Sequence, residues 1–248
     1  GSVLSPYLFA VYIDQLIRAL ESSGHGCVVH GVYLGCIVYA DDIFLMSHSS
    51  CSMQSMLHIC SNEIAKLRLT FNSKKSVTLR IGPRFNSDCA SLYLDGHVLQ
   101  SVTKVRYLGI FITSSRRMVC SFEHIRLKFY STFNAIYRRS KSADSELVTV
   151  ELIRSFCLPL ITYALEALNL RATDYLLLDN LLNNSLAKIF NVSHDRVVLH
   201  DIRLYLGIPS MKALCMVRHM KFVKKAAYIK NVAVQTALAI LQNEPISM

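Results

Sequence analysis

Two adjacent carboxylates, Asp41 and Asp42, interrupt an apolar run in the stretch from Gly35 to Ser47. Strand-forming residues stand on both sides, at 37–39 and 43–45, so the pattern predicts a hairpin with the two acids at its tip. The run is continuously apolar, which predicts strands covered on both faces. Two ionised neighbours at the rim of such a core repel each other and lose hydration, and a divalent cation would offset both costs. The pair therefore predicts a metal site, although Asp-Asp is also typical of an ordinary solvated turn.

Helical patterns stand on either side of this hairpin. Ser5 and Pro6 are typical of an N-cap and a first helical position, and apolar residues then recur at helical spacing up to Leu20. A second helix is expected over residues 52–69, and a strand over 76–81. Helices alternating with short strands predict an α+β domain in which the helices support a sheet.

Three stretches, in this order, resemble the reverse transcriptases of non-LTR (LINE-type) retrotransposons. They are Gly1-Ser-Val-Leu-Ser-Pro-x-Leu-Phe9, Tyr39-Ala-Asp-Asp42 and Asn72-x-x-Lys75-Ser76. The resemblance implies RNA-templated addition of deoxynucleotides with two Mg²⁺ ions at the reaction centre. Catalysis would rest on Asp41, Asp42 and Lys75. Neighbouring residues of an extended chain point to opposite sides, so Asp41 is expected to bind metal directly and Asp42 to bind or support it.

The resemblance also implies roles for residues around these carboxylates. Lys75 would balance the triphosphate charge or protonate the departing pyrophosphate, and its spacing from Asn72 fits better than that of Lys74. The alternative is a solvated turn lysine. The residues implied on the nucleotide and template side are Gly1, Ser2, Ser5, Tyr39 and Ala40.

Two further strand signals follow. Residues 92–99 predict a hairpin that turns at Asp95-Gly96, and residues 104–112 predict another strand. Within that strand, Tyr107-Leu108-Gly109 resembles the family motif that grips the primer end, and the glycine would let a nucleic-acid backbone approach closely. Without the resemblance, Gly109 is equally well explained as a bulge.

The chain is expected to turn helical from Cys120 onward. Helices are predicted over 122–138, 145–169, 172–190 and 210–230, with Pro159 kinking or dividing the second. By resemblance, residues 1–118 would be a partial polymerase palm, an antiparallel sheet with packed helices, and 119–248 an α-helical thumb and C-terminal region. Ser155-Phe-Cys-Leu-Pro159, with Tyr163 and Glu166, also looks like the LINE type.

The net charge of +10 is concentrated in the middle of the chain. Residues 1–50 have a net charge of −3, residues 51–142 of +11 and residues 143–248 of +2. A basic band beside an acidic hairpin suits a phosphodiester substrate, although a solvated basic face would look the same. The cations expected to contact a nucleic-acid backbone are Arg116, Arg117, Arg126, Lys128, Arg138 and Arg139.

The cysteine content and the lengths of the apolar runs indicate where in the cell the protein is expected. The 8 cysteines contain no C-x-x-C pair, so zinc is improbable, and nothing resembles a secretory signal. We therefore expect an intracellular protein, nuclear and cytoplasmic. The apolar runs, such as residues 37–46, fall short of a membrane span, so no membrane partner is expected.

The chain begins Gly-Ser-Val without an initiator Met and is expected to be a fragment. In the family, an upstream fingers and palm segment of the same polyprotein brings another aspartate that bridges both metals, and Asp14 does not replace it. We therefore expect the fragment to be inactive alone, and its hairpin to lack a neighbouring strand and to invite aggregation. The partners would be an RNA template, a DNA primer and deoxynucleoside triphosphates.

Three other interpretations compete with a LINE-type reverse transcriptase. A non-catalytic nucleic-acid-binding remnant of a polymerase would share the basic band, and an interaction protein would use the palm only as a scaffold. Among polymerases, group II intron maturases and telomerase fit the motif wording less well.

Overall fold

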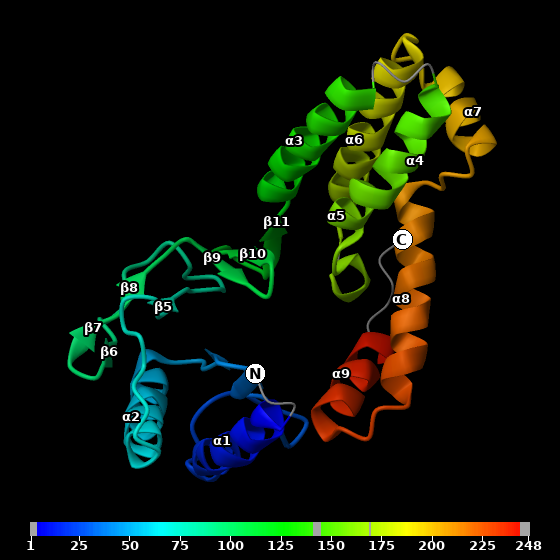
Figure 1. Ribbon diagram of the computed structural model, residues 1–248. Helices are drawn as coiled ribbons and strands as arrows, with labels where there is room; N and C mark the ends of the chain where they lie inside the picture. The colour runs from blue at the N-terminus through cyan, green and yellow to red at the C-terminus, as the bar shows by residue number, and fades with distance from the viewer. Residues whose placement is uncertain (1–3, 141–144, 169, 244–248) are drawn as a thin grey trace. The chain divides into compact units, whose positions relative to one another are not determined.

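The computed structural model describes residues 4–140, 145–168 and 170–243, which fall into two compact units (Figure 1). The first unit comprises residues 1–106, 112–119 and 229–248, and the second comprises 107–111 and 120–228. Helices and short strands are mixed, so the predicted α+β class is confirmed. The assignment of 1–118 to a palm and 119–248 to a thumb stays a prediction.

Two helices form the main core of the first unit. α1 (Ser5–Ser22) and α2 (Ser50–Lys66) bury one face each against the other. The fully covered apolar residues of this core are Ile13, Leu16, Leu20, Met56, Cys60 and Ile64. The Ser49 hydroxyl caps α2 by accepting a hydrogen bond from the Ser52 N–H at 3.1 Å.

The predicted N-cap role of Ser5 is wrong. α1 begins one residue earlier, with Leu4 at the N-cap position and no side-chain cap, so Ser5 lies inside the first turn. A proline stands near the start of this helix, and it removes one of the N–H groups that a capping side chain would satisfy.

The predicted hairpin is present as β3 (Cys36–Tyr39) and β4 (Asp42–Leu45). The strands are antiparallel, and Tyr39 lies opposite Asp42. Alternate residues of both strands pack against the α1–α2 core, namely Cys36, Val38, Ile43 and Leu45.

The other face of this hairpin is only partly covered by the described chain, since Phe44, opposite Ile37, is half-buried. Ile37 and Tyr39 are 46% and 62% exposed. The expectation of two covered faces is therefore wrong for this chain, because the helices pack on one face only.

Short strands make up the rest of the first unit. The pairs are β1 (Val28–Val29) with β2 (Val32–Tyr33), β6 (Tyr93–Leu94) with β7 (His97–Val98), and β5 (Val77–Thr78) with β8 (Gln100–Ser101). The predicted turn at Asp95-Gly96 is confirmed, since both residues have left-handed backbone, with φ of 50° and 76°. The strand predicted over 76–81 shrinks to β5, which pairs in parallel with β8 and so departs from the antiparallel pattern.

A three-stranded sheet follows at the point where the chain passes between the two units. Its order is β11 (Val119–Ser121), β10 (Ile110–Thr113) and β9 (Lys104–Tyr107). The single strand predicted over 104–112 is wrong, because the chain turns at Leu108-Gly109, where φ is 46° and 83°. Two adjacent residues with positive φ are typical of a tight hairpin turn rather than of a bulge.

The second unit is helical. Its elements are α3 (Glu123–Ser140), α4 (Glu146–Phe156), α5 (Leu158–Thr162), the 3₁₀ turn η1 (Leu165–Ala167), α6 (Ala172–Phe190), α7 (Arg196–Tyr205) and α8 (Met211–Ala227). The helix predicted over 172–190 is confirmed, and the chain breaks between α4 and α5 beside Pro159, as predicted. Two helices were not predicted from the sequence, namely α7 and α9 (Val232–Asn243), and α9 belongs to the first unit.

A buried ion pair joins three of these helices. Arg203 of α7 is 8% exposed, and its Nη1 lies 2.6 Å from Oδ1 of Asp179 on α6. The same oxygen accepts a hydrogen bond from the N–H of Met211, the first residue of α8, at 3.0 Å. The carboxylate is therefore satisfied from two directions, which a buried charge requires.

One segment of the second unit is apolar enough to cross a membrane by length and composition alone. An 18-residue stretch within Glu146–Ala167 has a mean hydropathy of 1.5, and 33% of this stretch is buried. This corrects the expectation that apolar runs in this chain are too short. The segment is divided into α4, α5 and η1, and it buries Val150, Ile153 and Ile161 in the helical core.

Candidate functional site

The predicted metal-binding hairpin has a two-residue turn at its tip. Ala40 and Asp41 form this turn, and Asp42 is the first residue of β4. Ala40 has a φ of 52°, a left-handed conformation that costs an L-residue roughly 1–2 kcal/mol. A positive φ at the first turn position resembles a type II′ turn, in which glycine is preferred.

Both carboxylates project from this tip into solvent. Asp41 and Asp42 are exposed, and no hydrogen bond or ion pair engages either one within the residues that the structure describes. The described chain therefore leaves the two carboxylates hydrated, contrary to the expectation that they lose hydration at the rim of a core. The register places Asp42 with Tyr39 on the face turned away from α1 and α2.

The donor set suits a hard cation only in part. Two carboxylates fit Mg²⁺, which is commonly held by one or two carboxylates plus waters and substrate phosphates. Across the described residues, no group of three or more His, Cys, Asp or Glu side chains gathers in a metal-binding arrangement. The pair therefore fits an incomplete magnesium site.

The core below the hairpin holds acidic groups in their neutral forms. Burial raises the pKa of the Cys60 thiol on α2 to about 12 and that of Cys36 on β3 to about 11. Burial also raises the pKa of Tyr33 to about 12. The Tyr33 ring fills space beside Gly35, where an added Cβ would lie only 2.6 Å from it. The carboxylates are thus the ionisable groups presented at the tip, and the thiols below serve as apolar packing.

Asn72 organises the turn that carries Lys75. The Lys75 N–H donates to the backbone oxygen of Asn72 at 3.0 Å and to its Oδ1 at 3.2 Å, and the Ser76 hydroxyl donates to the same backbone oxygen at 3.0 Å. Asn and Ser commonly bond to neighbouring backbone in this way. Lys75 itself is exposed, and no hydrogen bond or ion pair joins it to Asp41 or Asp42 in the described part of the chain.

The predicted primer-gripping residues form a turn that is held by a distant tyrosine. The Tyr163 hydroxyl donates to the backbone oxygen of Leu108 at 3.0 Å. A Cβ on Gly109 would lie 3.1 Å from Cε1 of Tyr163, so the ring occupies the space that the glycine leaves. The Tyr163 side chain, from the same unit, thus occupies the space on that side of Gly109 that was predicted to admit a nucleic-acid backbone.

The predicted basic contacts lie in both units, and those on α3 do not share one side of the helix. Arg116 and Arg117 lie exposed on the loop between β10 and β11, in the first unit, and the other four lie exposed on α3, in the second. At 100° per residue, Lys128 and Arg139 share one side of α3 whereas Arg126 points to nearly the opposite side. Of the residues predicted on the nucleotide and template side, Ser5 and Tyr39 are exposed, and Gly1 and Ser2 lie outside the described residues.

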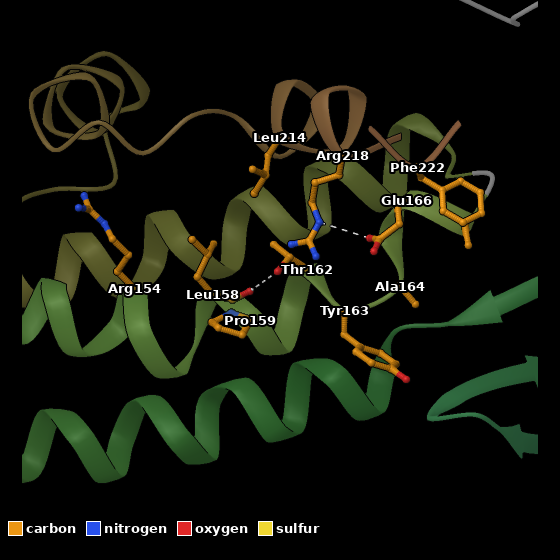
Figure 2. A pocket seen from close by; sticks show the side chains of 11 residues that line it. Arg154, Leu158, Pro159, Thr162, Tyr163, Ala164, Glu166, Leu214, Arg218 and Phe222 are labelled. Carbon is orange, nitrogen blue, oxygen red and sulfur yellow. Dashed lines mark hydrogen bonds and ion pairs between the residues drawn. The ribbon is translucent and has the colours of Figure 1, made fainter. Parts of the chain in front are cut away.

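A cavity of about 630 Å³ lies beside α5, η1 and α8 (Figure 2). Its lining includes an ion pair between Glu166 and Arg218, which was not predicted from the sequence. Arg218 points toward Glu166, and its Nε lies 3.3 Å from Oε2 of Glu166. The two residues are far apart in the sequence and come from different elements, so no local pattern signals the pair.

A comparison with known families decides what this hairpin belongs to. A family model described as "Reverse transcriptase (RNA-dependent DNA polymerase)" matches residues 1–112. Residues 1–112 belong to the reverse transcriptase family. This reverse transcriptase segment contains Asp41, Asp42 and Lys75, and the resemblance predicted from the motifs is confirmed.

Two curated relatives of the chain come from insects. The chain is 27% identical over 129 residues to "Retrovirus-related Pol polyprotein from type-2 retrotransposable element R2DM" of Drosophila melanogaster. It is 28% identical over 82 residues to "Retrovirus-related Pol polyprotein from type-1 retrotransposable element R2" of Popillia japonica. These matches cover 49% and 33% of this chain, respectively, and 12% of each polyprotein.

Proposed function

We propose that this chain forms part of the palm and the thumb of an RNA-directed DNA polymerase, with Asp41 and Asp42 as its magnesium ligands. One observation carries the proposal: within the family-matched residues, a two-residue turn presents two adjacent, exposed carboxylates that no side chain of the described chain neutralises. A tip built in this way is suited to receive a cation from solvent.

Each side chain has a task in this proposal. Asp41 and Asp42 supply oxygen ligands at the turn, and the strained Ala40 fixes where they project. Bound there, Mg²⁺ would favour ionisation of the primer hydroxyl and offset charge on the leaving phosphates. Lys75, on the turn organised by Asn72, balances triphosphate charge or gives a proton to pyrophosphate.

The nucleic-acid strands would be held by cations away from the hairpin. Arg116 and Arg117 contribute from the first unit and the basic residues of α3 from the second. Contacts of this kind position a phosphate backbone without reading its sequence. The partners of the chain would then be an RNA template and a DNA primer.

The isolated chain should be inactive. Two carboxylates form an incomplete site, and the family resemblance implies another aspartate from an upstream segment. Metal affinity falls when a ligand is missing, because Mg²⁺ depends on few, well-placed oxygens.

The test measures RNA-templated incorporation of labelled deoxynucleotides with and without Mg²⁺. It uses the chain alone and the chain extended by the segment upstream of it in its parent polyprotein. Only the extended protein should be active. In that protein, Asp41→Asn should lower the rate by more than about a hundredfold, beyond the 10- to 100-fold typical of outer-shell residues. Asp88→Asn, an exposed acid outside the hairpin, should leave the rate unchanged.

Synthesis by the 248-residue chain alone would overturn its proposed inactivity, and an unaffected Asp41→Asn variant would overturn the metal role. The net charge of +10 also favours a second candidate, a nucleic-acid-binding remnant without catalysis. Salt-dependent RNA binding by an extended protein that never incorporates nucleotides would support that candidate.

A further inference from the structure

We propose that a groove between α3 and α6 binds an unpaired nucleotide of a single-stranded nucleic acid, with its phosphate on Lys188. The groove lies wholly within the second unit and encloses about 880 Å³. It is separate from the carboxylate hairpin, which lies in the first unit. The class of ligand rests on the proposed function, and the site rests on the groove itself.

Lys188 lies over two aromatic rings at the edge of the groove. Its Nζ lies 5.6 Å from the centroid of the Phe133 ring and 5.0 Å from that of Tyr137, within reach of a cation–π interaction. Asn134 Oδ1 lies 3.5 Å from the same Nζ. No carboxylate pairs with Lys188 among the residues that the structure describes. The ammonium is thus held in place with no carboxylate of the described residues beside it.

The lining of the groove is rich in side-chain amides. Three exposed carboxamides, on Asn134, Asn180 and Asn184, line the groove with Tyr130 and His194. Asn184 Nδ2 donates to the Tyr130 hydroxyl at 3.2 Å, which fixes the orientation of both side chains. Carboxamides carry donors and acceptors side by side, as the edges of nucleobases do.

The charge of the groove favours an anionic ligand. The residues that line the groove include no acid, so an anionic ligand meets no repulsion there. Asp179, next to Asn180 in the sequence, is engaged by Arg203. A lysine beside amides and an aromatic ring is the combination used by proteins that bind single strands through phosphate and base together.

The helical spacing adds a second cation along the path of a strand. Asn180, Asn184 and Lys188 recur every four residues on α6, and Arg126 lies one turn before Tyr130 on α3. A strand that follows the groove would therefore reach Arg126 after leaving Lys188. In a base-paired duplex the Watson–Crick edges of the bases are already engaged, and carboxamides that bind these edges therefore require unpaired nucleotides.

The experiment measures fluorescence anisotropy of labelled oligonucleotides of about ten nucleotides, the size of one single-strand site. The ligands are single-stranded RNA, single-stranded DNA and the matching duplex, without Mg²⁺ or deoxynucleotides. Lys188→Gln should weaken single-strand binding about tenfold and lower the salt slope by about 0.7, the loss of one phosphate contact. Lys221→Gln, an exposed lysine on α8, is the matched control and should change affinity less than twofold.

A second pair of variants separates binding from folding, because Lys188 also packs on two rings. Asn180→Asp adds a carboxylate to the groove at a side chain that takes part in no hydrogen bond within the described residues, and it should weaken binding as Lys188→Gln does. Ser155→Asp, exposed on α4, adds the same charge outside the groove.

Equal effects of Asn180→Asp and Ser155→Asp would overturn the proposal. The proposal would also be overturned if Lys188→Gln lowered the melting temperature while Asn180→Asp left binding unchanged. Lys188 would then stabilise the fold rather than bind the ligand. Tighter binding of duplex than of either single strand would also overturn it, and the RNA and DNA arms show which strand binds. Because no nucleotide is incorporated in this assay, its failure leaves the proposed polymerase function untouched.

Discussion

The hydroxyl of Tyr163 donates a hydrogen bond to the backbone oxygen of Leu108, at 3.0 Å, and its ring covers Gly109. The contact ties the turn between β9 and β10 to the segment that follows α5. Gly109 therefore has two reasons to be glycine, its φ of 83° and the nearby ring.

Replacing Gly109 by alanine should destabilise the protein more than the same change at Gly207. Both residues have positive φ, at 83° and 66°, but an added Cβ meets Tyr163 at 3.1 Å only at Gly109. Backbone strain alone costs about 1 kcal/mol, so Gly207→Ala should lose about that amount and Gly109→Ala more. Chemical denaturation measures both. Equal losses would show that the ring yields without cost.

Ala40→Gly should stabilise the hairpin. Glycine removes the left-handed strain at a φ of 52°, a gain of roughly 1 kcal/mol that is partly offset by the greater freedom of the unfolded chain. Ala40→Val should act in the opposite direction, because β-branched residues rarely adopt positive φ. Melting temperatures of the two variants give the comparison, and a stabilising valine would exclude a left-handed Ala40 in solution.

Ile37→Thr should increase the fraction of soluble monomer without lowering stability. Ile37 is 46% exposed on the face of the hairpin turned away from α1 and α2, where an apolar surface favours association. Val38→Thr is the matched control, because Val38 packs against the α1–α2 core and a buried hydroxyl there should lower the melting temperature. Gel filtration and thermal unfolding report the two effects. If both variants behaved alike, the two faces of the hairpin would not differ as described.

The free energy of unfolding should fall as the pH rises into the alkaline range, because the Cys60 thiol is buried. Burial raises its pKa from an ordinary value of 9.0 to about 12, so the unfolded chain loses this proton first as pH rises. The stabilising contribution is complete below pH 9 and is lost as pH rises from about 9 toward 12, by about 1.4 kcal/mol per pH unit. Cys60→Ala should remove that slope. Identical slopes of unfolding free energy between about pH 9 and 10 in the two proteins would contradict a buried thiol.

Local signals in the sequence were enough to locate several elements of this protein. The hairpin around Asp41 and Asp42, the turn at Asp95-Gly96 and the helix over 172–190 each rest on residue types that act within a few positions. Turn chemistry and apolar periodicity depend on near neighbours, so they can be read without knowing the fold. The ordered motifs were also sufficient to predict the reverse transcriptase family.

Contacts between distant residues were decided by the tertiary structure alone. Examples are the ring of Tyr163 over Gly109, the pair of Arg203 with Asp179, and Lys188 seated on Phe133 and Tyr137. Strand register determined that Asp42 lies on the face turned away from the core, which an apolar run cannot reveal. These relationships depend on how helices and strands pack after the chain has folded, and no pattern within one segment encodes them.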